Sequence, residues 1–292
     1  MDAEDAVREC FPKVSSGLMK MAAARAVSDV PVSEMGVEDP VRVLEAVGKD
    51  RKAIASFSKM IGCERSLAME YMGPYGDVPG FCERPLTDVR PRFNIVVLTD
   101  MEGNPNGMIP FGCGFEDEAF IYSELRGCGR IIVTDRVPYS RENRMALDRS
   151  KEEYLLIERD FPESYGSTQN AKMQDLKHDG KTLSACKIRF DKQWLFRFTD
   201  HEKAERVRRW IETSDISERN RGYIELTAGT TDIVSNSGMD VREALRLKEV
   251  RDDMDSKMDR HRRLLAQEIG VVDSEPAVMG YLFMSVLSMM IS

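Results

Sequence analysis

Two windows of the sequence gather the side chains that could bind phosphate groups. Residues 121–151 carry seven basic against four acidic side chains, and residues 181–209 carry nine basic against four acidic ones. Arginines on turns and strand ends, with Tyr139 nearby, suit contacts to phosphates and stacking on bases. The alternative is a solvated face whose charges balance acidic neighbours, and charge alone leaves both interpretations open.

No local pattern typical of an active site occurs in the sequence. The three histidines, His178, His201 and His261, are far apart and lie in polar surroundings. Neither H-E-x-x-H nor G-x-S-x-G occurs, and there is no glycine-rich phosphate loop. The abundant Asp and Glu residues would allow a carboxylate-bound metal nuclease, although such residues usually form a solvated surface. We therefore expect no catalytic residue, no metal ligand and no cofactor.

Length and composition are those of a folded globular protein. The 292 residues are 42% hydrophobic and 32% charged, enough for one large or two modest domains with a core. The net charge of −8 argues against a nucleic-acid surface spread over the chain, so an anion-binding surface must be local. The six cysteines form no C-x-x-C pair and no secretory leader is evident, which predicts reduced thiols in a chain that is not secreted.

Apolar periodicity predicts helices in the first sixty residues. Pro12 separates two N-terminal helices because proline breaks a helix interior. Asp39-Pro40 is a typical helix start, with a carboxylate at the cap and proline at the first helical position. The apolar residues that follow share one face until Gly62 supplies a stop. We expect these helices to form part of the hydrophobic core.

Helices are also predicted in the last third. One spans 200–213, is capped by Asp200, and has Trp210 on its apolar face. The longest spans 240–268, and its apolar stripe either docks on the body or forms a coiled coil with a partner chain. The uncharged segment 277–291 is shorter than a membrane span and predicts a buried terminal helix or an interface segment, so no membrane is expected.

The middle of the chain predicts a loop-rich body with few strands. Residues 72–114 are dense in turn and breaker residues, and 115–125 resemble a short helix. Three short apolar runs, at 93–98, 130–133 and 154–157, predict buried strands. Strands and helices do not alternate, which argues against a doubly wound parallel sheet.

A long polar stretch interrupts this body. Residues 162–180 have no apolar period, which predicts disorder or a functional excursion. The segment 183–198 then returns to apolar residues, with Trp194, Phe196 and Phe198 in alternation. We expect this apolar segment to be buried in something other than the core of its own chain.

Read in chain order, short signatures of this sequence resemble the C-terminal two-thirds of orthomyxovirus nucleoproteins. The strings that carry the resemblance are M-G-P at 72–74, G-F-C-E-R at 80–84, G-N-P at 103–105, F-E-D at 115–117, S-R-E-N at 140–143, Y-L-L-I at 154–157, I-R at 188–189 and R-G-Y-I-E-L at 221–226. Each string alone is weak evidence of a relationship. The resemblance is based on their shared order along the chain, with similar gaps between them.

This resemblance implies a fold and a function. The fold would be mainly α-helical with a few short strands, a crescent body with a protruding tail loop. Residues 1–162 would form the body, 163–199 the tail loop, and 200–292 a C-terminal helical part that packs on the body. The protein would coat single-stranded viral RNA without sequence preference, and it would form homo-oligomers when the tail loop inserts into a neighbouring copy.

The resemblance also assigns residues. The positions implied in RNA binding are Arg126, Arg130, Arg136, Arg141, Arg144 and Arg159. For oligomerisation it implies a buried pair between Glu116 and Arg189, with Trp194 and Phe196 filling the neighbour's pocket. A shift in register would give the role of Arg189 to Lys187 or Arg197, and in the alternative interpretation Arg189 is simply exposed and Glu116 is an unrelated surface residue.

Partners and location follow from the same resemblance. Expected partners are single-stranded viral RNA, further copies of the chain and viral polymerase subunits, in virions and in the nucleus or cytoplasm of infected cells. The competing hypothesis is a structural or interaction protein of a virion or host complex that does not bind RNA. A metal-dependent nuclease is the third.

Overall fold

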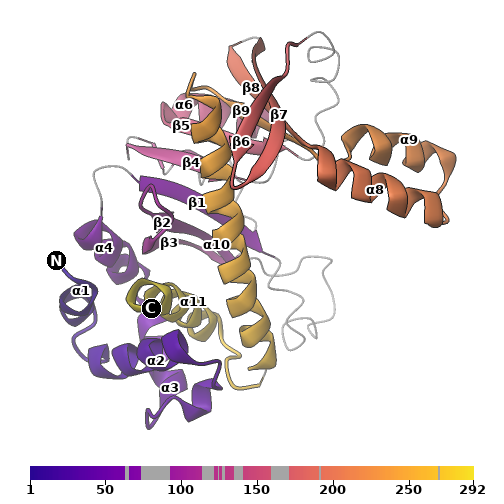
Figure 1. Cartoon of the computed structure of the whole chain (residues 1–292). Helices are drawn as coiled ribbons and strands as arrows, with labels where there is room; N and C mark the ends of the chain where they lie inside the picture. Colours follow the sequence, from indigo (N-terminus) through magenta and orange to yellow (C-terminus); the bar gives the residue numbers. More distant parts are fainter. Residues whose placement is uncertain are drawn as a thin grey trace. The chain divides into compact units, whose positions relative to one another are not determined.

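The computed structural model describes residues 1–62, 66–73, 93–113, 122–123, 125–126, 129–134, 141–158, 171–190, 192–268 and 270–292. The chain divides into two compact units (Figure 1). Unit 1 comprises Met1–Ile132, Arg141–Glu152 and Val250–Ser292, and unit 2 comprises Val133–Ser140 and Glu153–Glu249. Each unit joins segments that are distant in sequence, whereas the expected division was into the three consecutive parts 1–162, 163–199 and 200–292.

The protein is an α/β protein, and the expectation of a mainly α-helical fold with a few short strands is wrong. Nine strands are present in the described residues. They are β1 (Ser66–Gly73), β2 (Phe93–Thr99), β3 (Pro105–Cys113), β4 (Arg130–Thr134), β5 (Glu153–Glu158), β6 (Gln174–His178), β7 (Lys181–Phe190), β8 (Gln193–Asp200) and β9 (Thr230–Ser235). The three predicted strands are confirmed as parts of β2, β4 and β5. The other strands were not predicted: turn residues conceal β3, and the resemblance placed the segment of β7 and β8 in a tail loop.

The protruding tail loop is part of the same correction. Of residues 163–199, the structure describes 171–190 and 192–199, and most of them lie in β6, β7 and β8. These strands pair with one another, and β8 pairs with β9 of the same chain. This part of the segment is therefore held by its own sheet, because its backbone groups find partners within unit 2.

Unit 1 contains most of the helices. They are α1 (Ala3–Cys10), α2 (Ser15–Val27), the short 3₁₀ helix η1 (Val32–Glu34), α3 (Pro40–Lys49), α4 (Arg51–Ile61), α6 (Arg141–Ser150), the end of α10 (Val241–Gln267) and α11 (Glu275–Ile291). The predicted caps are confirmed: the Asp39 side chain accepts a hydrogen bond from the backbone N–H of Arg42, and Pro40 occupies the first turn of α3. A second cap at Asp50 begins α4, so the predicted helix is divided in two.

The core of unit 1 is built around α11, so the first of the two alternatives for the uncharged C-terminal segment, a buried terminal helix, is confirmed. This helix contacts α3, α2 and β3, and the ring of Phe283 lies 5.1 Å from that of Phe57 in an edge-to-face arrangement. Glycines allow the backbones of α3 and α11 to touch: a Cβ on Gly280 would lie 2.0 Å from the carbonyl oxygen of Leu44. Among the described residues, no helix has both the length and the apolar composition that a bilayer span requires.

The strands of unit 1 include an antiparallel sheet in the order β3-β2-β1. The outer strand β3 contains Pro110, which an edge strand tolerates because it needs no partner on its outer side. Ser58 of α4 joins the helices to this strand, since its hydroxyl accepts from the Met108 N–H at 2.8 Å and donates to the Met108 carbonyl at 2.8 Å.

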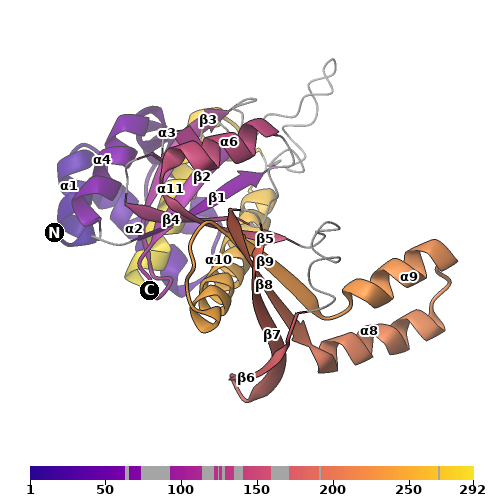
Figure 2. The ribbon, with the colours of Figure 1, turned by 90° about the horizontal axis from the view of Figure 1, so that it is seen from above.

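Unit 2 is an antiparallel sheet in the order β5-β9-β8-β7-β6, with two further helices. These are α8 (His201–Thr213) and α9 (Glu218–Thr227), which lie side by side in both ribbon views (Figures 1 and 2). The first residues of α10, up to Glu249, also belong to this unit. Strands β8 and β9 share a buried ion pair, in which Arg197 donates to Asp232 at 2.7 and 2.6 Å.

Candidate functional site

Of the six arginines predicted to bind RNA, the structure describes the side chain of Arg126. Arg126 is exposed in unit 1. Arg130 lies at the start of β4, and Arg141 and Arg144 lie in α6, but their side chains fall outside the described part of the structure, as do all of Arg136 and Arg159. The assignment of an RNA surface to these residues therefore stays a prediction.

The residues predicted for oligomerisation lie in unit 2, except Glu116, which is outside the described residues. Arg189 is exposed on β7, and its guanidinium carbon lies 5.0 Å from the centre of the Trp194 ring on β8. Lys187 lies 4.4 Å from the same ring, and its ammonium donates to the carbonyls of Gly238 and Met239. Phe196 is fully buried. Trp194 and Phe196 thus already have neighbours within their own chain.

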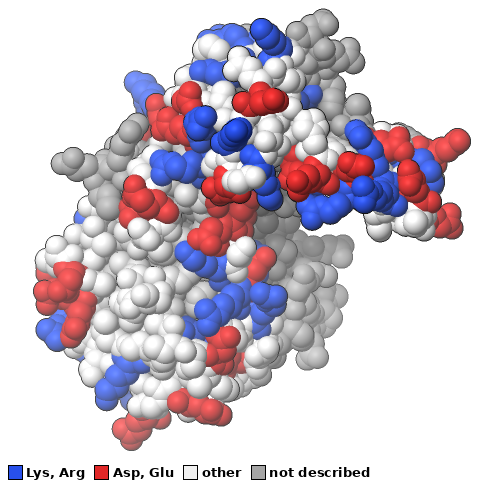
Figure 3. Space-filling model, in the orientation of Figure 1, with Lys and Arg blue, Asp and Glu red and all other residues white. Residues whose placement is uncertain are grey.

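The helix α8 of unit 2 carries a stripe of basic and aromatic side chains on its exposed side. The Asp200 side chain caps this helix by accepting from the backbone N–H of Lys203 at 2.9 Å, as predicted. Lys203, Arg206 and Trp210 follow at spacings of three and four residues, which places them on one face of the helix. We call these three residues the α8 stripe. Lysine and arginine side chains gather visibly over α8 in Figure 3.

Trp210 corrects a detail of the sequence interpretation. The apolar face of α8 was expected to include it, but its side chain is 56% exposed. The helix instead buries Ala204 and Ile211, and Trp210 lies about a quarter turn away from Ile211. The signal was available in the sequence, because neighbouring residues on a helix point in directions about 100° apart and only one of the pair can face the core.

The two cations of the α8 stripe differ from the neighbouring Arg209 in their ion pairing. Within the described residues, neither Lys203 nor Arg206 forms an ion pair, whereas Arg209 on another face pairs with Glu205 at 3.2 Å. Both Lys203 and Arg206 are exposed. A polyanion that reaches this face would therefore meet two solvated cations beside an indole ring.

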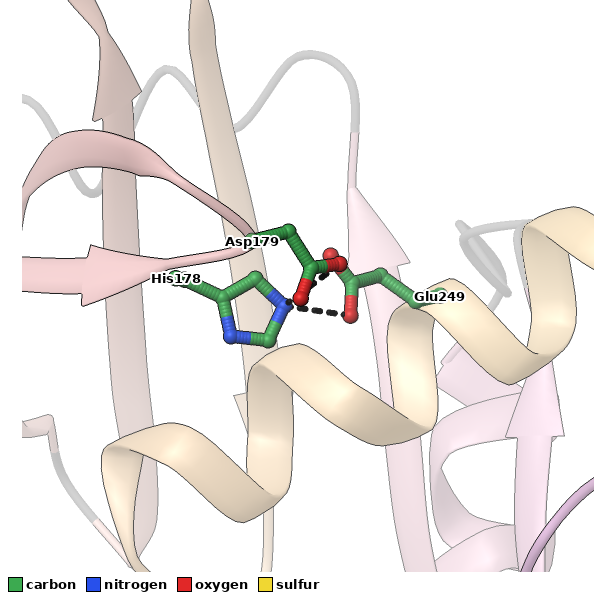
Figure 4. A group of neighbouring side chains, drawn as sticks. All are labelled: His178, Asp179 and Glu249. Carbon is green, nitrogen blue, oxygen red and sulfur yellow. Dashed lines mark hydrogen bonds and ion pairs between the residues drawn. The ribbon is translucent and has the colours of Figure 1, made fainter.

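A second group of side chains meets at the turn between β6 and β7. His178, Asp179 and Glu249 come from the end of β6, from the turn itself and from α10, and all three belong to unit 2 (Figure 4). The Nε2 atom of His178 lies 2.6 Å from a carboxylate oxygen of Glu249 and 3.8 Å from one of Asp179. One ligand atom from each residue lies within 4.8 Å of the other two.

No sequence pattern predicts this group. Glu249 is 71 residues from His178, and no local motif joins them. The expectation of no metal ligand was based on the absence of such motifs. One local signal for the turn was present in the sequence. The dipeptide Asp179-Gly180 is typical of a two-residue turn between two antiparallel strands.

Buried titratable groups add little to the chemistry of unit 2. Burial raises the pKa of the Cys186 thiol, which outweighs the opposing influence of Arg197. A thiol with a raised pKa is a weak nucleophile near neutral pH. Cys186 therefore behaves as a small core side chain.

Comparison with known proteins assigns no family to this chain. No protein-family model matches the sequence, and a search of curated proteins also finds no match. The nucleoprotein resemblance stays a prediction based on short signatures.

Proposed function

We propose that this chain binds single-stranded RNA without sequence preference, through the α8 stripe of unit 2. The observation that carries the proposal is the alignment of Lys203, Arg206 and Trp210 on one exposed helix face. This retains the RNA-binding part of the sequence hypothesis. Its two cations lie in the second basic window, 181–209, and Trp210 directly follows that window.

The chemistry of the three residues matches that of a single strand. The cations can each approach a phosphate, and Trp210 offers a flat apolar surface on which a base can stack. Stacking tolerates any base, because every base has a π-face, and so predicts little sequence preference. Trp194 is less suited to this role, because Lys187 and Arg189 already lie against its ring.

Fluorescence anisotropy with a labelled single-stranded RNA oligonucleotide tests the proposal. Wild type should bind at low salt, and K203A/R206A/W210A should bind at least tenfold more weakly, since stacking alone contributes about 1–3 kcal/mol per base. The slope of log affinity against log salt should become shallower by about 0.7 for each phosphate contact removed.

A matched control separates local contacts from net charge. The variant K49A/R209A also removes two positive charges, but both cations are engaged in i,i+4 ion pairs outside the stripe. It should bind RNA as the wild type does. Equal losses in the two variants would reduce the effect to overall charge and contradict the proposal.

The second candidate function is docking of a protein partner on the same helix face. Exposed tryptophan beside arginine is typical of the energetic centre of protein interfaces. This corresponds to the competing hypothesis of an interaction protein that does not bind RNA. Wild type that fails to bind the oligonucleotide at low salt would favour it over RNA binding.

A further inference from the structure

The turn between β6 and β7 gives Asp179 a defined backbone conformation. Asp179 and Gly180 both have left-handed backbone angles, with φ of 46° and 75°. Two successive residues of this kind form the tight turn that joins twisted antiparallel strands, and asparagine satisfies such a turn as well as aspartate does. The turn therefore explains the backbone of Asp179 and gives no reason for its negative charge.

Within the described part of the chain, no lysine or arginine pairs with the two carboxylates at this turn. Asp179 and Glu249 form ion pairs only with His178 among the residues that the structure describes. Lys181 faces His178 in the register of the hairpin, but its ammonium forms no ion pair with either carboxylate. Two carboxylates held this close repel each other, which favours a cation between them.

The spacing of the three ligand atoms fits one small cation. Ligand atoms about 2.0–2.2 Å from a zinc ion lie roughly 3–3.5 Å from one another. The observed separations of 2.6 and 3.8 Å from Nε2 to the two carboxylates bracket that range. Small side-chain rotations would bring all three ligand atoms within bonding distance of one ion, in place of the present hydrogen bond between His178 and Glu249.

The identity of the ligands selects the class of ion. Imidazole favours first-row transition ions such as Zn²⁺, whereas carboxylates also suit Mn²⁺ and Mg²⁺. The mixed set of one imidazole and two carboxylates thus favours a first-row ion over Mg²⁺. The Asp179 side chain is 84% exposed and that of Glu249 is 41% exposed, so the remaining coordination positions would be open to water.

We propose that His178, Asp179 and Glu249 form a binding site for one divalent first-row transition ion. The ion would join the β6–β7 hairpin to the start of α10, both within unit 2. With three protein ligands the site would retain at least one exchangeable water position. This site is independent of RNA binding by the α8 stripe.

Cobalt absorption spectroscopy on the full chain tests the proposal, with Co²⁺ as a visible probe for Zn²⁺. We expect one equivalent of Co²⁺ to produce visible d–d bands, without the intense near-ultraviolet band that cysteine ligation would add. Zn²⁺ should displace the cobalt. D179N and E249Q should each weaken binding at least tenfold, while the amide side chains preserve the turn and a hydrogen bond to His178.

His201 provides the matched control, because it is an exposed histidine of unit 2 that is hydrogen-bonded to Ser184 at 2.7 Å and lacks the carboxylate pair. H201A should bind Co²⁺ as the wild type does, and H178A should lose the visible bands. Absence of cobalt binding in the wild type would overturn the proposal. So would binding that is unchanged in E249Q and H178A, or a spectrum dominated by cysteine ligation.

Discussion

The helices α11 and α8 are both amphipathic or apolar in sequence, yet they occupy opposite environments. Every residue of α11 from Ala277 to Ser288 is buried. In α8, the buried residues are only Ala204 and Ile211, and the rest of the helix carries charges into solvent. The first helix belongs to the core of unit 1, and the second lies on the surface of unit 2.

This difference separates stability from binding. Side chains that are buried on all sides contribute to stability through packing, and a ligand cannot reach them. The exposed indole and cations of α8 contribute little to the core and can contact a ligand directly. We therefore expect substitutions in unit 1 to change the free energy of unfolding, and substitutions on the α8 stripe to change RNA affinity.

Replacing Gly280 by valine should have the largest effect. Because the Cβ of a residue here would lie 2.0 Å from the backbone oxygen of Leu44, α3 and α11 would have to move apart. We expect G280V to lose the cooperative unfolding transition of unit 1 in urea, measured by circular dichroism. Gly222 of α9 is the control, since a Cβ there meets nothing within 4 Å and alanine favours a helix by up to about 1 kcal/mol. A near-normal transition in G280V would contradict the packing of α11.

Arg197→Ala should be nearly as damaging, although the residue lies in unit 2. The substitution leaves Asp232 buried, at 4% exposure, without its bidentate partner. Removing one member of such a pair typically lowers the free energy of unfolding by about 3–5 kcal/mol. R197M/D232L should recover most of that loss in urea denaturation, because no uncompensated charge remains. Arg209→Ala breaks an exposed pair and should change stability by at most about 0.5 kcal/mol.

His261 should make unit 1 sensitive to acid. Burial, with further contributions from Arg25 and Arg260, lowers the pKa of His261 from 6.5 to about 4. Between these values the unfolded chain binds a proton that the folded chain does not, so stability is complete above about pH 6.5 and is lost toward pH 4. The expected loss is about 3 kcal/mol.

Urea denaturation across this pH range measures the effect, with H261L as the comparison. That variant should lose less stability than the wild type between pH 6.5 and pH 5, where most carboxylates remain ionised. If the free energy of unfolding falls equally with pH in the two proteins, His261 does not titrate in this way.

The smallest effect concerns the cap of α8. Asp200→Ala removes the acceptor for the Lys203 N–H and should lower the free energy of unfolding by about 1 kcal/mol. Fraying of the first turn should also weaken RNA binding slightly, because Lys203 lies in that turn. Asp200→Asn keeps an acceptor and should retain both properties, which thermal denaturation and anisotropy can check.

The sequence was a good guide where a single element carries its own signal. The apolar period and the capping residues predicted the N-terminal helices, α8, α10 and α11, and the apolar runs predicted β2, β4 and β5. These signals are local, since a helix cap or an apolar stripe needs only a few neighbouring residues.

The missed strands needed information from a partner strand. β3 contains Asn106-Gly107 and Pro110, which indicate turns, yet its backbone pairs with β2 through two register shifts. The alternation of Trp194, Phe196 and Phe198 was itself a strand pattern, but the nucleoprotein resemblance led to its assignment to an inserting loop. The site at His178 was missed because only the fold brings Glu249 close to it.

Tryptophan fluorescence tests the central claim most directly. The chain has two tryptophans, Trp194 and Trp210, so W194F leaves Trp210 as the single indole reporter. Single-stranded poly(U) should quench this fluorescence at low salt through stacking on Trp210, and added salt should restore it. Fluorescence that stays unchanged while the RNA binds elsewhere, or no binding at all, would contradict the account.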